Sequence, residues 1–466
     1  MLLSSPVYVL VASCPLLLVL LVRRLSSPLR RVPGPTYSLV TSFILKYHEL
    51  RAGRTAYIHR LHQHYGPVVR IAPKEVSFTS WSAIKEIYCS GGSGYDKTSF
   101  YDLFKIYGRR TMFTMLNKTD HARRKRLLAD RYANTSIMHS ATMQGIQERA
   151  QAFIRRCTSA SGSRTSEAFR ADEDMMHQIT ADDSLQNRLI SQYSPTLHRA
   201  FASLLALFVK PREVPLADEY VTGASKRTDV ASFALVNRLW EKNVELDSTD
   251  VAAECLDHMV AGIDTTGDSL CFLLWELSQP RSRSHQVRLT EELRSNPEAP
   301  LEQLPFLDAV VCETLRCYPA IPMSLPRLVP SGGRIVDGTW LPEGTIVSCQ
   351  AYSVQRINQE VFPRPETYDP CRWLELEGDV DRRRLLFAFA SGGRGCVGKH
   401  LALAEMKTLL RDVYSNFSTT PDPSMTENSM AMSDQLISTR PKGQRCLIQF
   451  HPLDNQNVRV GGEARA

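Results

Sequence analysis

The stretch Phe389-Ala390-Ser391-Gly392-Gly393-Arg394-Gly395-Cys396-Val397-Gly398 sets one cysteine and one arginine among four glycines. A helical pattern follows at once, because apolar residues recur at three- and four-residue spacing from Ala402 to Val413. Cys396 is therefore expected on a glycine-rich loop that opens a helix. Unpaired backbone N–H groups and the positive end of the helix dipole favour a thiolate there and lower its pKa.

These residue types together predict a flat ligand that carries a carboxylate. Glycines let such a ligand approach the backbone closely, and Arg394 can offer two N–H groups to a carboxylate. A thiolate is also a metal ligand. The combination predicts a haem with an axial cysteine. The alternative is that Cys396 is an ordinary buried cysteine in a glycine loop.

The complete pattern F-x-x-G-x-R-x-C-x-G resembles the haem-binding loop of the cytochrome P-450 family, the haem-thiolate monooxygenases. Its fixed positions are Phe389, Gly392, Arg394, Cys396 and Gly398. The resemblance implies haem b as the cofactor, with Cys396 as the metal ligand. It also implies a mainly α fold with a small β region, a triangular prism of helices around a buried haem.

Composition excludes several other classes of protein. The chain has 466 residues, of which 43% are apolar, so it can bury a large core. The net charge of +7 is modest, and no zinc-ligand spacing indicates a nucleic-acid partner. Eleven cysteines without paired spacing argue against a disulfide scaffold and for a reducing compartment.

The N-terminus predicts a membrane anchor. Residues 2–22 carry no charge, and as a helix they would span roughly 31 Å, close to the thickness of a bilayer core. Arg23 and Arg24 follow, which favours a cytosolic C-terminal side. A cleaved signal peptide is the alternative, but a basic segment before the apolar run and a cleavage site are not evident. Pro33-Gly34-Pro35 resembles the hinge that follows the anchor in membrane-bound family members.

The chain is therefore predicted to comprise four parts. Residues 2–22 form a transmembrane helix, residues 23–40 a basic and Pro/Gly-rich hinge, and residues 41–452 the catalytic domain. Residues 453–466 form a polar tail. The resemblance places the protein in the endoplasmic reticulum membrane as a single-pass protein with its catalytic domain in the cytosol.

A long helix is predicted from Thr249 to Ser278, and its centre is unusual. Glycine and paired threonines weaken a helix in Ala261-Gly262-Ile263-Asp264-Thr265-Thr266, and threonine hydroxyls can bond back to the preceding turn. A tolerated kink is one interpretation. The other is a widened turn that holds dioxygen, because A-G-x-D-T-T resembles the family's oxygen-activation motif. The resemblance implies that Asp264 and Thr265 deliver protons.

Three further charged residues match a family network. Glu313 and Arg316 lie on one face of a helix predicted over residues 307–317, and alone they would be read as a surface ion pair. Arg372 follows in a P-x-R segment just before the cysteine loop. E-x-x-R followed by P-x-R resembles the family's buried Glu–Arg–Arg network, which has a structural role.

Other residues are assigned to the haem only through the resemblance. Arg327 resembles the family's second propionate-binding arginine. His121 and Lys125 belong to a basic helix, which would otherwise be read as a solvated charged face. Family members often have Trp and Arg at these two positions, so the propionate role of His121 and Lys125 stays open.

Shorter sequence patterns predict further strands, turns and helices. Strands are expected at residues 68–71 and 76–79, and Ser80 is expected to cap a helix over residues 81–88. Turn signals at Asp337-Gly338 and Pro342–Gly344 predict hairpins over residues 334–349. Residues 140–245 read as several helices.

The function implied is monooxygenation of a small hydrophobic metabolite, as in fungal secondary metabolism. Because the sequence has no dinucleotide fingerprint, electrons would come from an NADPH-cytochrome reductase, with cytochrome b5 as a further donor. Two alternatives stay open. One is a haem-thiolate isomerase or dehydratase that consumes no dioxygen, and the other is a membrane-tethered protein that senses haem or lipid.

Overall fold

The computed structural model describes residues 15, 18, 19, 22, 24–89, 94–161, 185–208, 215–227, 229–231, 234–242 and 246–453. Most of the predicted membrane helix and nearly all of the predicted tail lie outside these residues. Within the described part, no helix is both long and apolar enough to cross a membrane.

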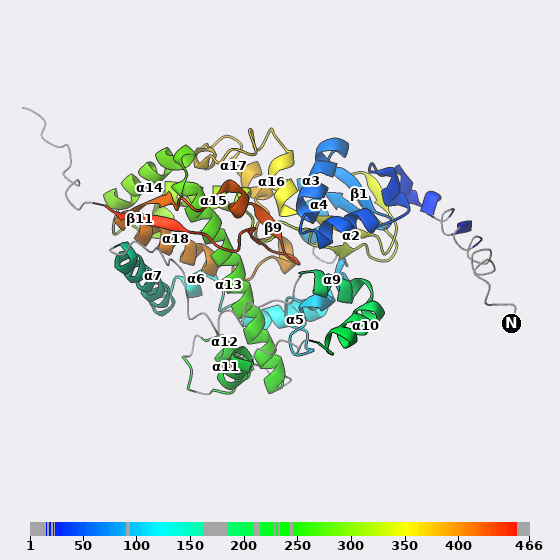
Figure 1. The fold of residues 1–466 in the computed structure, drawn as a ribbon, viewed down its shortest axis with the longest axis horizontal. Helices are drawn as coiled ribbons and strands as arrows, with labels where there is room; N and C mark the ends of the chain where they lie inside the picture. Colours follow the sequence, from blue (N-terminus) through cyan, green and yellow to red (C-terminus); the bar gives the residue numbers. More distant parts are fainter. Residues whose placement is uncertain are drawn as a thin grey trace, which may run out of the picture.

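The molecule is mainly helical with small sheets, as predicted (Figure 1). Several helices occupy residues 140–245, in agreement with the sequence. The described α-helices are α2 Phe43–Leu50, α3 Arg54–Tyr65, α4 Trp81–Ile84, α5 Lys118–Leu128, α6 Asn134–Ile137, α7 Ser140–Ser161, α9 Leu185–Tyr193, α10 Pro195–Leu205, α11 Pro215–Ser225, α12 Leu235–Lys242, α13 Ser248–Ser278, α14 Arg283–Ser295, α15 Pro305–Cys317, α16 Ala351–Ile357, α17 Asp379–Leu385, α18 Lys399–Asn416 and α19 Glu427–Met430.

Helix α13 is the long helix that the sequence predicted, and it runs through the middle of the molecule (Figure 1). It has 31 residues and starts with a capping box, in which the side chains of Asp247 and Asp250 each accept the other's backbone N–H. Its first half packs against α11 and α12, and its second half against α14, α15 and α18. Its last residues, Phe272–Ser278, are all buried, so α13 is fixed firmly at that end.

The larger sheet joins strands from distant parts of the chain. Its order is β1-β2-β7-β4-β3, and only the β2–β7 pair is parallel. The first predicted strand pair is confirmed, whereas the last predicted strand leaves the expected hairpin to join β2 and β4. The strands of this sheet are β1 Val68–Ala72, β2 Glu75–Phe78, β3 Asp96–Lys97, β4 Arg327–Leu328 and β7 Ile346–Cys349.

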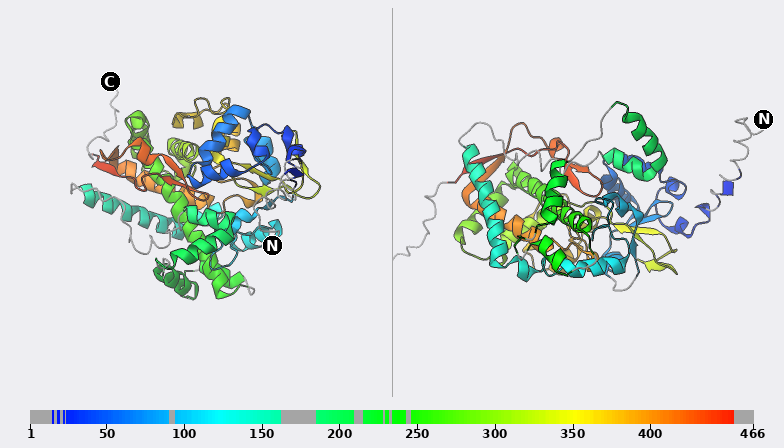
Figure 2. Two further views of the ribbon diagram at one scale, coloured as in Figure 1. Left: turned by 45° about the vertical axis from the view of Figure 1, so that its right-hand side comes forward. Right: turned by 90° about the horizontal axis from the view of Figure 1, so that it is seen from below.

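Three two-stranded sheets complete the β structure, and Figure 2 shows that they lie on different sides of the helical body. The predicted turn at Asp337-Gly338 is confirmed, since both residues have positive φ and connect the first pair. The pairs are β5 Arg334–Val336 with β6 Thr339–Leu341, β8 Phe417–Pro421 with β11 Ile448–Pro452, and β9 Met432–Asp434 with β10 Thr439–Pro441.

Residues 24–40 lie against this body. Leu29 and Val32 are each only 3% exposed. The buried Arg70 of β1 donates hydrogen bonds to the carbonyl oxygens of both, at 2.9 Å and 2.6 Å. Because a guanidinium without acceptors is costly to bury, this segment belongs to the folded domain from about residue 28 onward.

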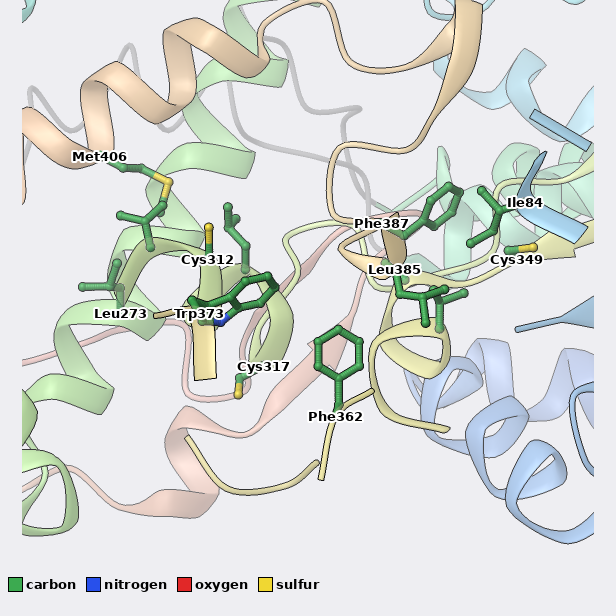
Figure 3. Close-up of a cluster of buried hydrophobic side chains, with 14 of the residues drawn as sticks. Ile84, Leu273, Cys312, Cys317, Cys349, Phe362, Trp373, Leu385, Phe387 and Met406 are labelled. Atoms are coloured by element: carbon green, nitrogen blue, oxygen red, sulfur yellow. The ribbon is translucent and has the colours of Figure 1, made fainter. Parts of the chain in front are cut away.

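The main core lies where α13, α14, α15 and α18 meet the segment before the cysteine loop. In Figure 3, Trp373 from this segment projects towards the part of α15 that carries Cys312 and Cys317. The ten described cysteines are all free, as the sequence predicted. The core is therefore held by packing and by polar contacts.

The strongest polar contact in this core is the predicted Glu–Arg–Arg network. Glu313 and Arg316 are 0% exposed, so the alternative of a surface ion pair is wrong. Arg316 donates Nε and Nη2 to the two Glu313 oxygens at 2.9 Å each, and Arg372 Nε donates to Oε1 at 3.1 Å. The Trp373 indole and the Asp369 backbone N–H also donate to Glu313, both at 2.9 Å.

The charges of this network are well compensated. Burial acts to raise the pKa of the Glu313 carboxyl, but Arg316 and Arg372 outweigh burial and hold that pKa below its usual range. Arg316 also donates to the carbonyl oxygens of Pro365 and Thr367, at 2.7 Å and 3.1 Å. Helix α15 is thereby fastened to the segment 365–373 that leads into the cysteine loop.

We predict that Arg316→Leu lowers the free energy of unfolding by about 3–5 kcal/mol, because it leaves the Glu313 charge buried without its main partner. Arg384→Leu is the matched control, since Arg384 is half exposed and its ion pair with Asp381 lies at the surface. The control should change stability by less than about 0.5 kcal/mol. Chemical denaturation of both variants measures the difference, and an Arg316→Leu protein as stable as the control would contradict a structural role.

Candidate haem site

The loop around Cys396 is fixed by its backbone. Gly392 has φ +71°, and a Cβ atom there would lie 2.0 Å from the carbonyl oxygen of Tyr88. Only glycine therefore lets the short 3-10 turn Gly392–Arg394 pack against the π-helical segment Lys85–Cys89, which continues α4. The Cys396 N–H donates to the Phe389 carbonyl at 2.9 Å, which closes the loop.

The Cys396 thiol is partly shielded by the surrounding protein. Protein atoms surround the thiol on most sides, yet the residue remains accessible to solvent. Helix α18 starts three residues later, as predicted, with Gly398 at its N-cap. A Cβ on Gly398 would lie only 3.9 Å from the sulfur.

The predicted lowering of the Cys396 pKa is wrong for the protein alone. Burial raises the pKa of this thiol, and this outweighs the N–H groups of Gly398 and Lys399 and the charges of Lys125 and Lys399. The helix terminus therefore does not create the thiolate by itself. A bound metal ion would, because coordination deprotonates a thiol.

Buried cations gather beside this loop. Strand β3 pairs with β4 in a register that sets Lys97 opposite Arg327, and both residues are only 4% exposed. Arg394 donates Nη2 to Asp96 at 3.1 Å, while its Nε and Nη1 are buried without a hydrogen-bond partner in the described structure. An orphaned, buried guanidinium is costly unless a further anion satisfies it.

The pKa values show the excess of positive charge. Burial, then Arg327, lowers the pKa of Arg394 to about 10, and burial with Arg327 and Arg394 holds the pKa of Lys97 well below its usual range. Burial and the nearby cations lower the pKa of His121 to about 3. His121 is therefore neutral at physiological pH, and the surroundings favour added carboxylates.

Lys125 lies at the loop rather than in this cation cluster. Its Nζ donates to the carbonyl oxygens of Gly393 and Gly395, at 3.0 Å and 3.1 Å. In the structure these two hydrogen bonds connect α5 to the cysteine loop. No sequence pattern indicated this contact, because Lys125 and Gly393 are far apart along the chain.

The middle of α13 supplies an open helix face. Ala261 and Gly262 are exposed, although they lie halfway along a helix that crosses the molecule. Thr265 is partly exposed and donates its hydroxyl to the Ala261 carbonyl at 2.6 Å, whereas Thr266 is buried at 9% exposure. All residues here are α-helical, so the predicted widened turn is not seen. The back-bonding of the threonine hydroxyl is confirmed.

Asp264 is held by a residue that no sequence pattern indicated. Its Oδ2 lies 3.1 Å from Arg440 Nη2, and Arg440 belongs to β10 near the end of the described chain. Lys97 was missed likewise, because residues 91–118 show no clear periodicity. Only the β3–β4 register could have signalled its position.

Comparison with known proteins shows the family. The cytochrome P-450 family model matches residues 189–447, more than half of the chain, and this range includes Asp264, Glu313 and Cys396. The chain belongs to the cytochrome P-450 family of monooxygenases. Proteins of this family use haem with a cysteine thiolate ligand.

The chain is similar over most of its length to fungal monooxygenases. It is 29% identical to the cytochrome P-450 monooxygenase tazI of Aspergillus terreus, over 96% of this chain and 98% of that protein. It is 29% identical to the monooxygenase stcB of Emericella nidulans, over 91% and 88% of the two chains. It is 27% identical to the monooxygenase orf2 of Aspergillus niger, over 92% and 94%.

The residues present fit a haem. Cys396 is exposed, and two nitrogens of the nearby Arg394 are buried without a hydrogen-bond partner among the described residues. A Cβ on Gly262 or on Gly393 would meet nothing within 4 Å, so both backbones border open space. These features match a planar group with two carboxylates and one axial ligand.

Proposed function

We propose that this protein is a haem-thiolate monooxygenase that inserts one oxygen atom from dioxygen into a small hydrophobic metabolite, in secondary metabolism. The observation that carries the proposal is the exposed Cys396 on a loop whose Arg394 is buried among cations with two nitrogens lacking a hydrogen-bond partner in the described structure. Family membership and the similarity to fungal monooxygenases support it. We further propose that the electrons come from an NADPH-cytochrome reductase, with cytochrome b5 as a further donor.

The residues have distinct roles in this proposal. Cys396 is the axial ligand, and Arg394 and Arg327 hold the propionates together with Lys97. Haem with a thiolate ligand supplies the activation and cleavage of dioxygen. His121 is neutral and can donate one N–H group. Lys125 holds the loop that presents Cys396, so its contribution is to orientation.

We assign the supply of protons to residues of helix α13. The Thr265 hydroxyl lies one turn from the exposed Ala261 and Gly262, so it can hold a proton at the open helix face. Asp264 precedes it and is partly exposed. We assign Asp264 to bring protons from solvent and Thr265 to orient them.

The basic helix α5 suits an acidic partner. Arg123 and Arg126 are exposed, on the helix that carries Lys125 to the cysteine loop. A positive surface next to the cofactor site would steer the negatively charged face of a reductase towards it. This placement supports an external electron donor.

Membrane attachment is proposed from the apolar N-terminal run and from exposed apolar residues. Helix α9 packs against both α2 and α10. Phe43 of α2 is 67% exposed, and α10 with its following turn exposes Phe201 and Phe208 at 52% and 80%. Such a surface is unusual on a soluble monomer. We propose that it lies on the cytosolic side of the endoplasmic reticulum membrane, next to the single-pass anchor.

We predict that deletion of residues 1–25 releases much of the protein from membranes while haem content is kept. The deletion must end before Leu29, because Leu29 is buried and its carbonyl accepts from Arg70. Fractionation and haem absorbance measure the outcome. Glycans on the Asn117, Asn134 or Asn416 sequons of the full-length protein would contradict a cytosolic domain.

The oxygen chemistry is tested by three variants of α13. Incubation with reductase and an extract of the producing organism, with and without NADPH, first identifies the product. We predict that Thr265→Ala still oxidises NADPH but releases hydrogen peroxide in place of product. Asp264→Asn should slow turnover, because positioned proton transfer contributes about 10²–10⁴-fold.

Thr266→Ala is the matched control, since Thr266 is buried beside Thr265 on the same helix. It should keep nearly the wild-type ratio of product to NADPH. If Thr265→Ala also keeps that ratio, α13 does not activate oxygen as proposed, and a haem enzyme that consumes no dioxygen becomes the better interpretation.

A further inference from the structure

One guanidinium on β10 faces two carboxylates on α13. Asp264 and Asp268 are four residues apart, so they share one face of the helix. Arg440 Nη2 lies 3.1 Å from Asp264 Oδ2, and Arg440 Nε lies 3.8 Å from Asp268 Oδ2. All three side chains are largely shielded from solvent, with exposed fractions of 16% for each aspartate and 22% for the arginine.

The backbone fixes Arg440 in front of the helix. In the β9–β10 pair, Arg440 is opposite Ser433. The neighbouring Thr439 is fully buried, and its N–H donates to the Ala320 carbonyl at 3.0 Å. Strand β10 also packs directly on α13. The guanidinium is therefore held on a rigid strand, and the two carboxylates compete for it.

The Arg440 guanidinium lies closer to Asp264 than to Asp268. The contact to Asp264 is a close ion pair, whereas Asp268 Oδ2 is buried without a hydrogen-bond partner among the described residues. Burial raises the pKa of Asp268 to about 7, the Arg440 charge lowers it, and the Asp264 charge raises it. Arg440 and Asp264 are the charged groups that bear on Asp268 in the described structure. Asp268 therefore changes charge near neutral pH.

We propose that Arg440 and Asp268 are positioning residues that set how firmly Asp264 is held. When Asp268 is neutral, Arg440 pairs with Asp264 alone and keeps it in place. When Asp268 is ionised, it draws the guanidinium away and repels the Asp264 carboxylate, which weakens the Asp264–Arg440 ion pair and makes Asp264 more available to carry protons. This inference rests on the proposed role of Asp264 in proton supply.

The test uses the full-length, haem-loaded protein with its reductase and NADPH, without added substrate. NADPH oxidation is measured from pH 6 to pH 8 and divided by the rate at which the reductase alone reduces cytochrome c. The wild-type ratio should rise by about tenfold, because the ionised fraction of a group with a pKa near 7 rises by that factor. A flat wild-type profile would overturn the inference without any mutant.

The Asp268 and Arg440 variants should change the rate of NADPH oxidation in opposite directions. Asp268→Asn should give a low, flat profile, because Asp264 stays paired at every pH. Arg440→Gln should give a high, flat profile, and the double variant should resemble Arg440→Gln. Asp229→Asn and Arg227→Gln are the controls, since this pair is exposed and far from α13 in sequence. Both controls should keep the wild-type profile.

Two results separate this inference from the proposed function. If Asp264→Asn leaves NADPH oxidation unchanged, the proposed role of Asp264 itself fails. If Asp264→Asn slows it while Asp268→Asn and Arg440→Gln keep the wild-type pH profile, only the positioning role fails.

Thermal unfolding gives a measurement that is independent of turnover. In the folded protein Asp268 keeps its proton up to about pH 7, whereas an unfolded aspartate loses it near pH 4. Stability from this group therefore falls as the pH rises between these values. Asp268→Asn should make the fall in Tm over this range smaller, and an unchanged fall would overturn the buried, switchable state of Asp268.

Discussion

The Glu313 carboxylate is fully buried and accepts from Arg316, Arg372, Trp373 and the Asp369 backbone. Arg316 and Arg372 are themselves buried, so the carboxylate and the two guanidinium groups compensate one another's charge. The network joins α15 to the segment that leads to the cysteine loop. The position of Cys396 relative to α13 therefore depends on it.

The fold also explains the unusual charge distribution around the cysteine loop. The β3–β4 register buries Lys97 opposite Arg327, and Gly392 lets the loop approach Tyr88 so that Arg394 joins them. Three buried cations then lie near one another, and two nitrogens of Arg394 have no hydrogen-bond partner among the described residues. Burying cations together costs free energy, and bound anionic groups offset that cost. The same local excess of positive charge that is unfavourable for folding thus favours binding of the haem propionates.

Motifs whose residues lie close in sequence were predicted well. The cysteine loop, the long helix and the Glu313–Arg316 pair each carry their signal within about ten residues or a regular period. Contacts between distant segments were not predictable. Arg440 reaches Asp264 only because the β9–β10 pair packs on α13, and Lys125 meets the loop only because α5 folds back on it.

The pKa of Cys396 was predicted in the wrong direction for a related reason. The helix terminus is readable from sequence, whereas the depth of burial that outweighs it is a property of the whole fold. The same holds for Asp268, whose raised pKa follows from its place under β10. The sequence predicted Cys396 as the ligand but did not indicate Asp268, and the fold determines the pKa of both groups.

The central claim is that Cys396 binds haem as a thiolate. Its most direct test is the absorption spectrum of the reduced, carbon monoxide-bound protein, compared between the wild type and Cys396→Ser. We predict a red-shifted Soret band, characteristic of thiolate ligation, in the wild type and its loss in the variant. A wild type without that band, or a variant that keeps it, would contradict the account.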